Sequence, residues 1–182
     1  MVEDKKLLAF KRLNLADLCF KRSEALAQHV IDTHTDPLGL LYSPMMSGIV
    51  VTYMRPFVQA DGLGLLPDTF TQFADEILRS AHEHLKEARH KLYAHQDIKS
   101  ASDFITDDGS TPFDMWITFD GTKCVAFRPG VIEIAQKTLP DIVRLCQHQK
   151  ALVKQSINDA WPSLTGGKTY PPGCYHVGVD FP

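Results

Sequence analysis

The segment DTFTQFADEILRSAHEHLKEARHKLYAH, residues 68 to 95, carries apolar side chains at three- and four-residue intervals. On an α-helix this spacing gathers them into one stripe, which consists of Leu78, Ala81, Leu85, Ala88 and Leu92. Asp68 stands before the first residues of the pattern and is the expected N-cap. The segment therefore predicts an amphipathic helix from about residue 69 to residue 95, packed through this stripe.

Two further helical patterns precede this segment and one follows it. Residues 3–32 mix apolar and charged side chains with helical periodicity and predict a long amphipathic helix. Residues 39–55 are apolar on nearly all sides, as expected of a buried helix that stops at Pro56. A last helix is expected from residue 129 to about residue 161, with Pro140 in a first turn or at a kink.

Between the last two helices the pattern changes to that of a small β-hairpin. Short β-prone runs near residues 115–127 flank Asp120-Gly121-Thr122, a typical hairpin turn. Residues 165–182 contain several Pro and Gly residues and lack periodicity. We predict a mainly α fold, with one helical domain over residues 1–164 that carries a β-hairpin insert, and a tail over residues 165–182.

Composition limits the function classes. A chain of 182 residues with 44% apolar content can bury one core, and its net charge of −3, with 19 basic residues spread along it, shows no extended nucleic-acid footprint. Any polyanion site must therefore be local. We expect a cytoplasmic protein without a signal peptide or membrane span, whose four widely spaced cysteines remain reduced thiols and form no paired metal site.

The end of the central helix places two functional side chains beside its buried face. At about 100° per residue, Arg89 lies about 60° to one side of Leu92 and His95 about 60° to the other. Both side chains therefore border the apolar stripe. An Arg offers a planar fork of donors to phosphate oxygens, and a His exchanges protons near pH 7. With a 2′-hydroxyl as internal nucleophile, such a pair cleaves RNA without a metal ion.

The run Arg89-His90-Lys91-Leu92-Tyr93-Ala94-His95-Gln96-Asp97 resembles the signature of the HEPN superfamily, and most closely that of its abortive-infection-like branch. In that signature an Arg is followed by a polar residue and, a few positions later, by a His with an acidic residue soon after. Here His90 fills the polar position and Asp97 supplies the acid. The match covers about nine residues, and the order of long helices around it agrees with the family.

The resemblance implies an antiparallel bundle of four to five helices that forms a homodimer, with the two motifs facing each other across a shared cleft. It implies a metal-independent endoribonuclease without a cofactor, used in phage defence or as a toxin with a cognate antitoxin. Carried over by position, Arg89 binds and polarises the scissile phosphate, His95 is the general acid and base, and His90 supports both. Lys91, Tyr93 and Asp97 are the candidate substrate-binding residues. The hairpin and the tail depart from the minimal bundle, which leaves substrate and partner open.

A structural role for the same residues stays open beside the catalytic one. Arg89 can pair with Asp97 or with a carboxylate of a partner, and His95 can cap carbonyl groups at the helix end. The chain would then be a catalytically inactive, dimeric interaction module that binds a partner protein, a nucleotide or RNA.

Two neighbouring features of the sequence are interpreted in the same way. His82 and His84 project about 160° apart on a helix, so they do not share a metal ion, and with Glu83 and Glu87 they are expected to form a solvated face. Tyr53, Arg55 and Phe57 are expected to contribute to the cleft of the motif if the bundle folds as supposed.

Overall fold

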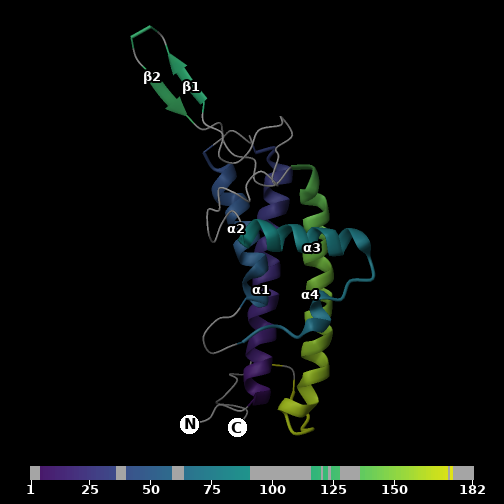
Figure 1. Ribbon diagram of the computed structural model, residues 1–182. Coiled ribbons are helices and arrows are strands. Elements are labelled where there is room, and N and C mark those ends of the chain that lie inside the picture. Colours follow the sequence, from purple (N-terminus) through teal and green to yellow (C-terminus); the bar gives the residue numbers. More distant parts are fainter. Residues whose placement is uncertain are drawn as a thin grey trace.

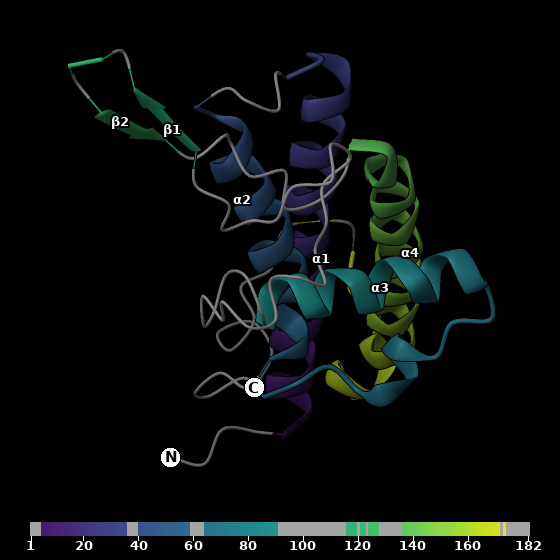
Figure 2. The same cartoon turned by 45° about the horizontal axis from the view of Figure 1, so that its top comes forward.

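The computed structural model describes residues 5–35, 40–58, 64–90, 116–119, 121–122, 124–127, 136–171 and 173. Three helices run side by side in it: α1 (Lys5–Asp32), α2 (Tyr42–Met54) and α4 (Leu139–Leu164). Both α2 and α4 run antiparallel to α1, and α3 (Glu76–Ala88) lies across the other helices (Figures 1 and 2). The prediction of a mainly helical body is confirmed, with the difference that α3 crosses the antiparallel helices at a steep angle.

The long helix α1 packs against both α2 and α4. Its apolar face buries residues at intervals of three, four and seven, namely Phe10, Leu13, Ala16, Phe20, Ala27 and Val30. The sequence predicted this helix from helical periodicity, but most of the residues that form its buried face differ from those that suggested it. A buried hydrogen bond from Ser23 Oγ to the carbonyl oxygen of Ile49, 3.0 Å long, fixes α1 against α2. Gly48 lets the two helices approach closely, because a Cβ there would lie 3.1 Å from Leu26 Cδ1.

The helix α2 is buried along most of its length, as predicted from its apolar composition. It ends at Met54 and passes into the 3-10 turn η1 (Arg55–Phe57), in which Pro56 is buried. Pro56 lacks the N–H that a continuing helix needs, while its carbonyl oxygen accepts a hydrogen bond from Leu66 N at 3.0 Å. The chain after residue 63 is thereby tied back to the end of α2.

The helix α3 begins seven residues later than the sequence suggested. Asp68 does not cap α3, because Asp68–Thr71 form the separate 3-10 turn η2. In this turn the carbonyl oxygen of Asp68 accepts a hydrogen bond from the Thr71 hydroxyl at 2.9 Å. Asp75 is the N-cap instead, and its side chain accepts from Ile77 N at 2.8 Å. The predicted start was therefore wrong. At the other end, Arg89 and His90 continue the helix as a wider π turn.

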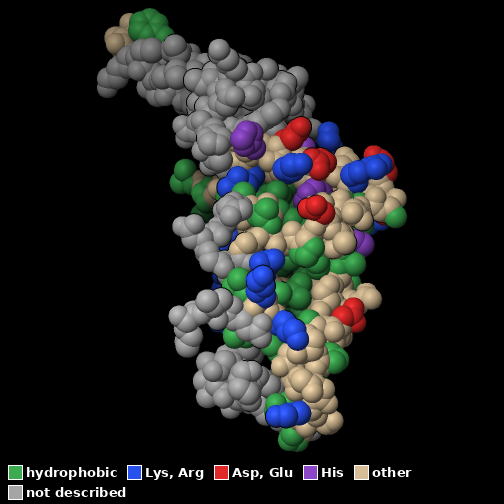
Figure 3. Space-filling model, turned by 60° about the horizontal axis from the view of Figure 1, so that its bottom comes forward, with side chains coloured by type: hydrophobic (Ala, Val, Ile, Leu, Met, Phe, Trp, Pro, Cys, Tyr) green, Lys and Arg blue, Asp and Glu red, His purple; other side chains and the backbone are tan. Residues whose placement is uncertain are grey.

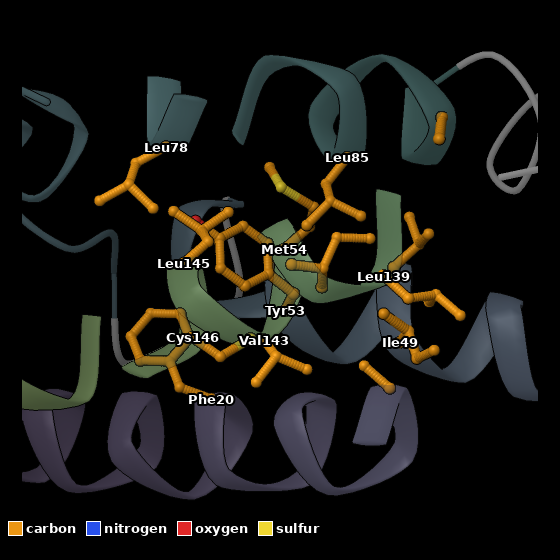
Figure 4. Packing of buried hydrophobic residues seen from close by; sticks show 14 of the residues in the cluster. Phe20, Ile49, Tyr53, Met54, Leu78, Leu85, Leu139, Val143, Leu145 and Cys146 are labelled. Atoms are coloured by element: carbon orange, nitrogen blue, oxygen red, sulfur yellow. The ribbon is translucent and has the colours of Figure 1, made fainter. Parts of the chain in front are cut away.

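Four residues of the stripe predicted on this helix, Leu78, Ala81, Leu85 and Ala88, face the core, whereas Leu92 lies outside the described residues. Leu78 and Leu85 point from α3 toward Tyr53 and Leu145, with Phe20 of α1 on the opposite side of the cluster (Figure 4). Leu85, Tyr53, Phe20 and Leu145 are all fully buried. Burial of these large side chains is the main stabilising contribution, at about 25 cal/mol per Å² of apolar surface removed from water.

The helix α4 begins at Leu139 with Pro140 in its first turn, which is one of the two placements predicted for that proline. A 3-10 turn, η5 (Gln136–Thr138), precedes it, and residues 129–135 of the predicted helix lie outside the described residues. An ion pair between Lys150 and Glu24 joins α4 to α1, and α4 ends at Leu164.

Two four-residue strands, β1 (Trp116–Phe119) and β2 (Cys124–Phe127), pair antiparallel with Trp116 opposite Phe127 and Phe119 opposite Cys124. The segments that join them to the helices lie outside the described residues. That the pair forms an insert in a HEPN-like bundle therefore stays a prediction, as do the proposed domain limits.

Replacing the observed N-cap tests the start of α3. We expect Asp75→Ala to lower the free energy of unfolding by about 1 kcal/mol, because the Ile77 N–H loses its acceptor. Asp75 also faces Arg144 at 3.4 Å in an exposed ion pair. The variant Asp75→Asn separates the two contacts, since Asn caps a helix as well as Asp but carries no charge. Urea unfolding should show Asp75→Asn close to the unmodified protein, and a larger loss for Asp68→Ala than for Asp75→Ala would contradict this assignment.

Candidate functional site: a cleft beside the end of α3

A cleft of about 590 Å³ lies beside the C-terminal half of α3, a size typical of small-ligand sites. We call it the α3 cleft. One wall is apolar and comes from the end of α2, from η1 and from the chain before η2, while the opposite wall is polar and comes from α3. Its lining consists of Met54, Phe57, Val58, Leu65, Leu66, Asp68, Thr71, His82, Glu83, Lys86, Glu87, Arg89 and His90.

The first two residues of the predicted motif belong to this cleft. Arg89 is half-buried and His90 is exposed, and both line it. Arg89 makes no ion pair with any other residue in the described part of the chain. The other predicted site residues, Lys91, Tyr93, His95 and Asp97, lie outside the described residues.

Of the three residues near the end of α2 that were expected to join the cleft, Phe57 does so directly. Tyr53 lies behind the cleft wall, in contact with His82. Arg55 is exposed and is absent from the lining.

The residue that the sequence analysis missed is His82. It was assigned to a solvated face, yet only 3% of its surface is exposed, which overturns that interpretation. Its position four residues after Leu78 and three before Leu85 places it at the edge of the buried stripe, and this spacing was the available signal. His82 occupies the floor of the α3 cleft, whereas Glu83 and Glu87 are exposed as expected.

Three aromatic rings and one hydroxyl surround the His82 imidazole. Its ring centroid lies 4.9 Å from that of Phe57, 5.2 Å from that of Phe73 and 5.8 Å from that of Tyr53. A buried hydrogen bond, 2.9 Å long, joins its Nδ1 to the Tyr53 hydroxyl. Burial lowers the pKa of His82, and it raises the pKa of Tyr53 well above the usual value. At neutral pH the pair is therefore an uncharged imidazole beside an intact phenol.

A buried glutamine of α4 completes this group. Gln149 Nε2 donates to the carbonyl oxygen of Phe70 at 2.8 Å, and the Gln149 amide also acts on Tyr53, where it counteracts the rise in pKa caused by burial. A carbonyl oxygen only accepts, so this contact fixes which end of the amide faces η2. Gln149 Oε1 is consequently buried and has no hydrogen-bond partner within the described residues.

The charges in the cleft are mixed. Glu83 and Lys86 pair with each other at 3.0 Å, which leaves Asp68 and Glu87 beside the single guanidinium of Arg89. Figure 3 shows the same mixture of acidic and basic side chains over the part of the surface where α3 lies. The cleft therefore has no strongly basic wall among the residues described.

The described residues form neither a metal-binding cluster nor a reactive thiol. No three His, Cys, Asp or Glu side chains gather there at a spacing suited to a metal ion. Cys19 and Cys146 are buried free thiols, as predicted, and burial raises the pKa of Cys146 to about 12.

No described helix combines the length and the apolar character that a membrane span needs.

Comparisons of the chain with models of known protein families, with curated proteins and with solved structures yield no match.

The burial of His82 predicts how stability depends on pH. Its pKa is lowered in the folded state, so the unfolded chain binds more protons as pH falls below about 6.5. The free energy of unfolding should therefore decrease as pH falls, and His84, whose pKa burial also lowers, adds to this trend. We expect His82→Gln to reduce the slope by up to about 1.4 kcal/mol per pH unit. Urea unfolding between about pH 8 and pH 5 measures it, and equal slopes for both proteins would show that His82 titrates alike in the folded and unfolded chain.

Proposed function

We propose that the chain is a metal-independent endoribonuclease of the HEPN type, with a HEPN-like helical bundle, acting as a toxin or phage-defence effector. The observation that carries the proposal is the position of Arg89 and His90 in the lining of the α3 cleft, at the point where the motif begins. An arginine at the edge of a half-apolar cleft holds an anion in an environment partly shielded from water, where its interactions are stronger than in bulk solvent.

The proposed reaction is an internal transesterification of RNA. Arg89 binds the phosphoryl oxygens, the 2′-oxygen attacks the phosphorus, and the bond from phosphorus to the 5′-oxygen breaks. His95 takes the proton of the 2′-hydroxyl, and the proton that the leaving 5′-oxygen needs comes from the same group or from its counterpart in a second copy. The proposed active unit is a homodimer in which the two motifs share one cleft, and a cognate antitoxin would restrain it.

The charge of the α3 cleft favours a second candidate function. Its lining contains three carboxylates, Asp68, Glu83 and Glu87, against two permanent cations, Lys86 and Arg89. Such a surface does not attract a long polyanion in the way that a basic groove does. A catalytically inactive interaction module, in which the cleft binds a partner protein or a nucleotide, is therefore the alternative.

Cleavage of RNA in the presence of EDTA tests the nuclease proposal. We expect the purified protein to cut single-stranded RNA without added metal. Arg89→Ala should slow cleavage by about 100-fold or more, because loss of one donor to the reacting phosphate typically has that effect. His95→Ala should have an effect of the same order or larger.

Arg79→Ala is the matched control on the same helix. Arg79 is exposed, pairs with Glu76 and is absent from the lining of the α3 cleft, so this variant removes the same charge from α3 without touching the site. Equal cleavage by the unmodified protein and by the Arg89 and His95 variants would assign the activity to a contaminant and remove the basis for the nuclease. Retention of the helical fold, measured by circular dichroism, must accompany each loss of activity.

A further inference from the structure

Counted on a regular helix, His82 of α3 and Arg89, which directly follows α3, lie on the same side. They are seven residues apart, which corresponds to two turns and an angular difference of about 20°. Side chains on an α-helix lean toward its N-terminus, a tendency that favours an Arg89 side chain directed toward His82. Both residues line the α3 cleft, His82 at its floor and Arg89 at its edge.

The hydrogen bonds behind His82 have a definite direction. Phe70 contributes a carbonyl oxygen, which accepts from Gln149 Nε2 and thereby turns the N–H groups of that amide toward η2. The hydroxyl of Tyr53 has no other hydrogen-bond partner within the described residues. A phenol O–H is a stronger donor than the N–H of a neutral imidazole, so this hydroxyl directs its hydrogen at His82 Nδ1.

This direction determines the tautomer of His82. The imidazole is neutral because it is buried, so it carries one ring hydrogen. Nδ1 accepts from Tyr53, which places the hydrogen on Nε2. Within the described residues Nε2 has no hydrogen-bond partner, and the ring belongs to the lining of the cleft.

We propose that His82 is a ligand-binding residue whose Nε2–H donates a hydrogen bond to a phosphoryl oxygen in the α3 cleft, next to Arg89. Tyr53 is the positioning residue that holds the donor in place through Nδ1. This inference rests on the proposed function in taking the phosphate to be that of RNA. A single guanidinium with one neutral donor suits one phosphate group, which agrees with the mixed charge of the lining better than an extended polyanion track does.

The neighbours of His82 favour a donor whose state is constant near neutral pH. Glu83 raises its pKa and Lys86 lowers it, and burial outweighs both. Tyr53 on α2 remains protonated, and Cys146 on α4 is a buried thiol, so neither places a charge beside the imidazole. Asp68 is the remaining charged group on the opposite wall of the cleft.

Two substitutions of His82 separate the cleft-facing atom from the atom bound to Tyr53. In His82→Gln the amide nitrogen reaches the position of Nε2 and keeps a donor in the cleft. In His82→Asn the shorter amide reaches the position of Nδ1, keeps a polar contact for Tyr53 and leaves the cleft without a donor. A merely structural role makes Asn the milder change, whereas a ligand-binding role makes Gln the milder one.

The probes are inorganic phosphate, a single-stranded RNA of mixed sequence carrying 2′-O-methyl groups, which is not cleaved, and uridine, which lacks a phosphate. We expect His82→Asn to weaken binding of phosphate and RNA by about 10-fold or more, the usual effect of losing a hydrogen bond to a charged group. His82→Gln should bind within about 3-fold of the unmodified protein. Uridine should bind all three proteins equally. The imidazole ¹⁵N resonances of His82 should show the Nε2–H tautomer in the free protein. In Tyr53→Phe they should show that the imidazole no longer has one fixed tautomer.

The inference is overturned if His82→Asn binds phosphate as tightly as the unmodified protein does, or if the resonances show hydrogen on Nδ1. Its failure differs from that of the proposed function, because the probes are bound and not cleaved. Phosphate binding that depends on His82, in a protein that never cleaves RNA, keeps the inference and removes the nuclease. Cleavage that depends on Arg89 but not on His82 supports the nuclease and removes the inference about His82.

Discussion

An imidazole removed from water must be neutral and hydrogen-bonded, and this requirement ties α3 to the rest of the protein. The hydrogen bond between Tyr53 and His82 is the buried polar contact between α2 and α3 that the structure describes. An unsatisfied group at this depth would cost about 1–3 kcal/mol. Because Phe57 and Phe73 enclose the same ring, the crossing helix is held in both position and rotation. The place of Arg89 at the edge of the cleft follows from that rotation.

The α3 cleft combines an apolar wall with polar and charged groups, as sites for small ligands commonly do. Its apolar wall resembles that of a site for an uncharged ring, its floor offers a polar atom, and its edge carries both signs of charge. A short anionic group attached to an apolar one fits these features better than either alone. In the proposed endoribonuclease and in the proposed interaction module, Arg89 therefore has the same role, which is to bind the anionic group. The two proposals differ in whether a proton is transferred beside it.

Sequence periodicity was sufficient for the helices and insufficient for their ends. The helical pattern of α1 and the apolar composition of α2 were predictable, because both depend on local properties. For Pro140 the sequence left a first turn and a kink open, and the structure has the first turn. The start of α3 was not, since Asp68 and Asp75 are equally good caps and Phe70 extends the apolar pattern between them. Tertiary packing, in which Phe70 enters the core from a 3-10 turn, decided between the two.

The candidate site was predictable in the same uneven way. Arg89 and Phe57 both line the α3 cleft, whereas the cleft between two copies that the resemblance implies stays a prediction. His82 did not stand out, because it belongs to a run of polar residues with Glu83 and His84, and histidines are only intermediate in burial. Its burial depends on Tyr53, which lies far away in the sequence and supplies the polar contact that a buried histidine needs. No pattern within α3 alone carries that information.

The widened turn at Arg89 and His90 alters how distances along the motif should be counted. Geometrically it equals one residue inserted into a regular helix, and one residue corresponds to about 100° of rotation. A helix that resumed after such a turn would present its next side chains on a face rotated by that amount. Two chains whose arginine and histidine differ in separation by one residue can thus bring them to the same place, provided that one chain contains the wide turn and the other does not. For motifs of this kind, the number of residues between the arginine and the histidine does not by itself give the angle between them around the helix axis.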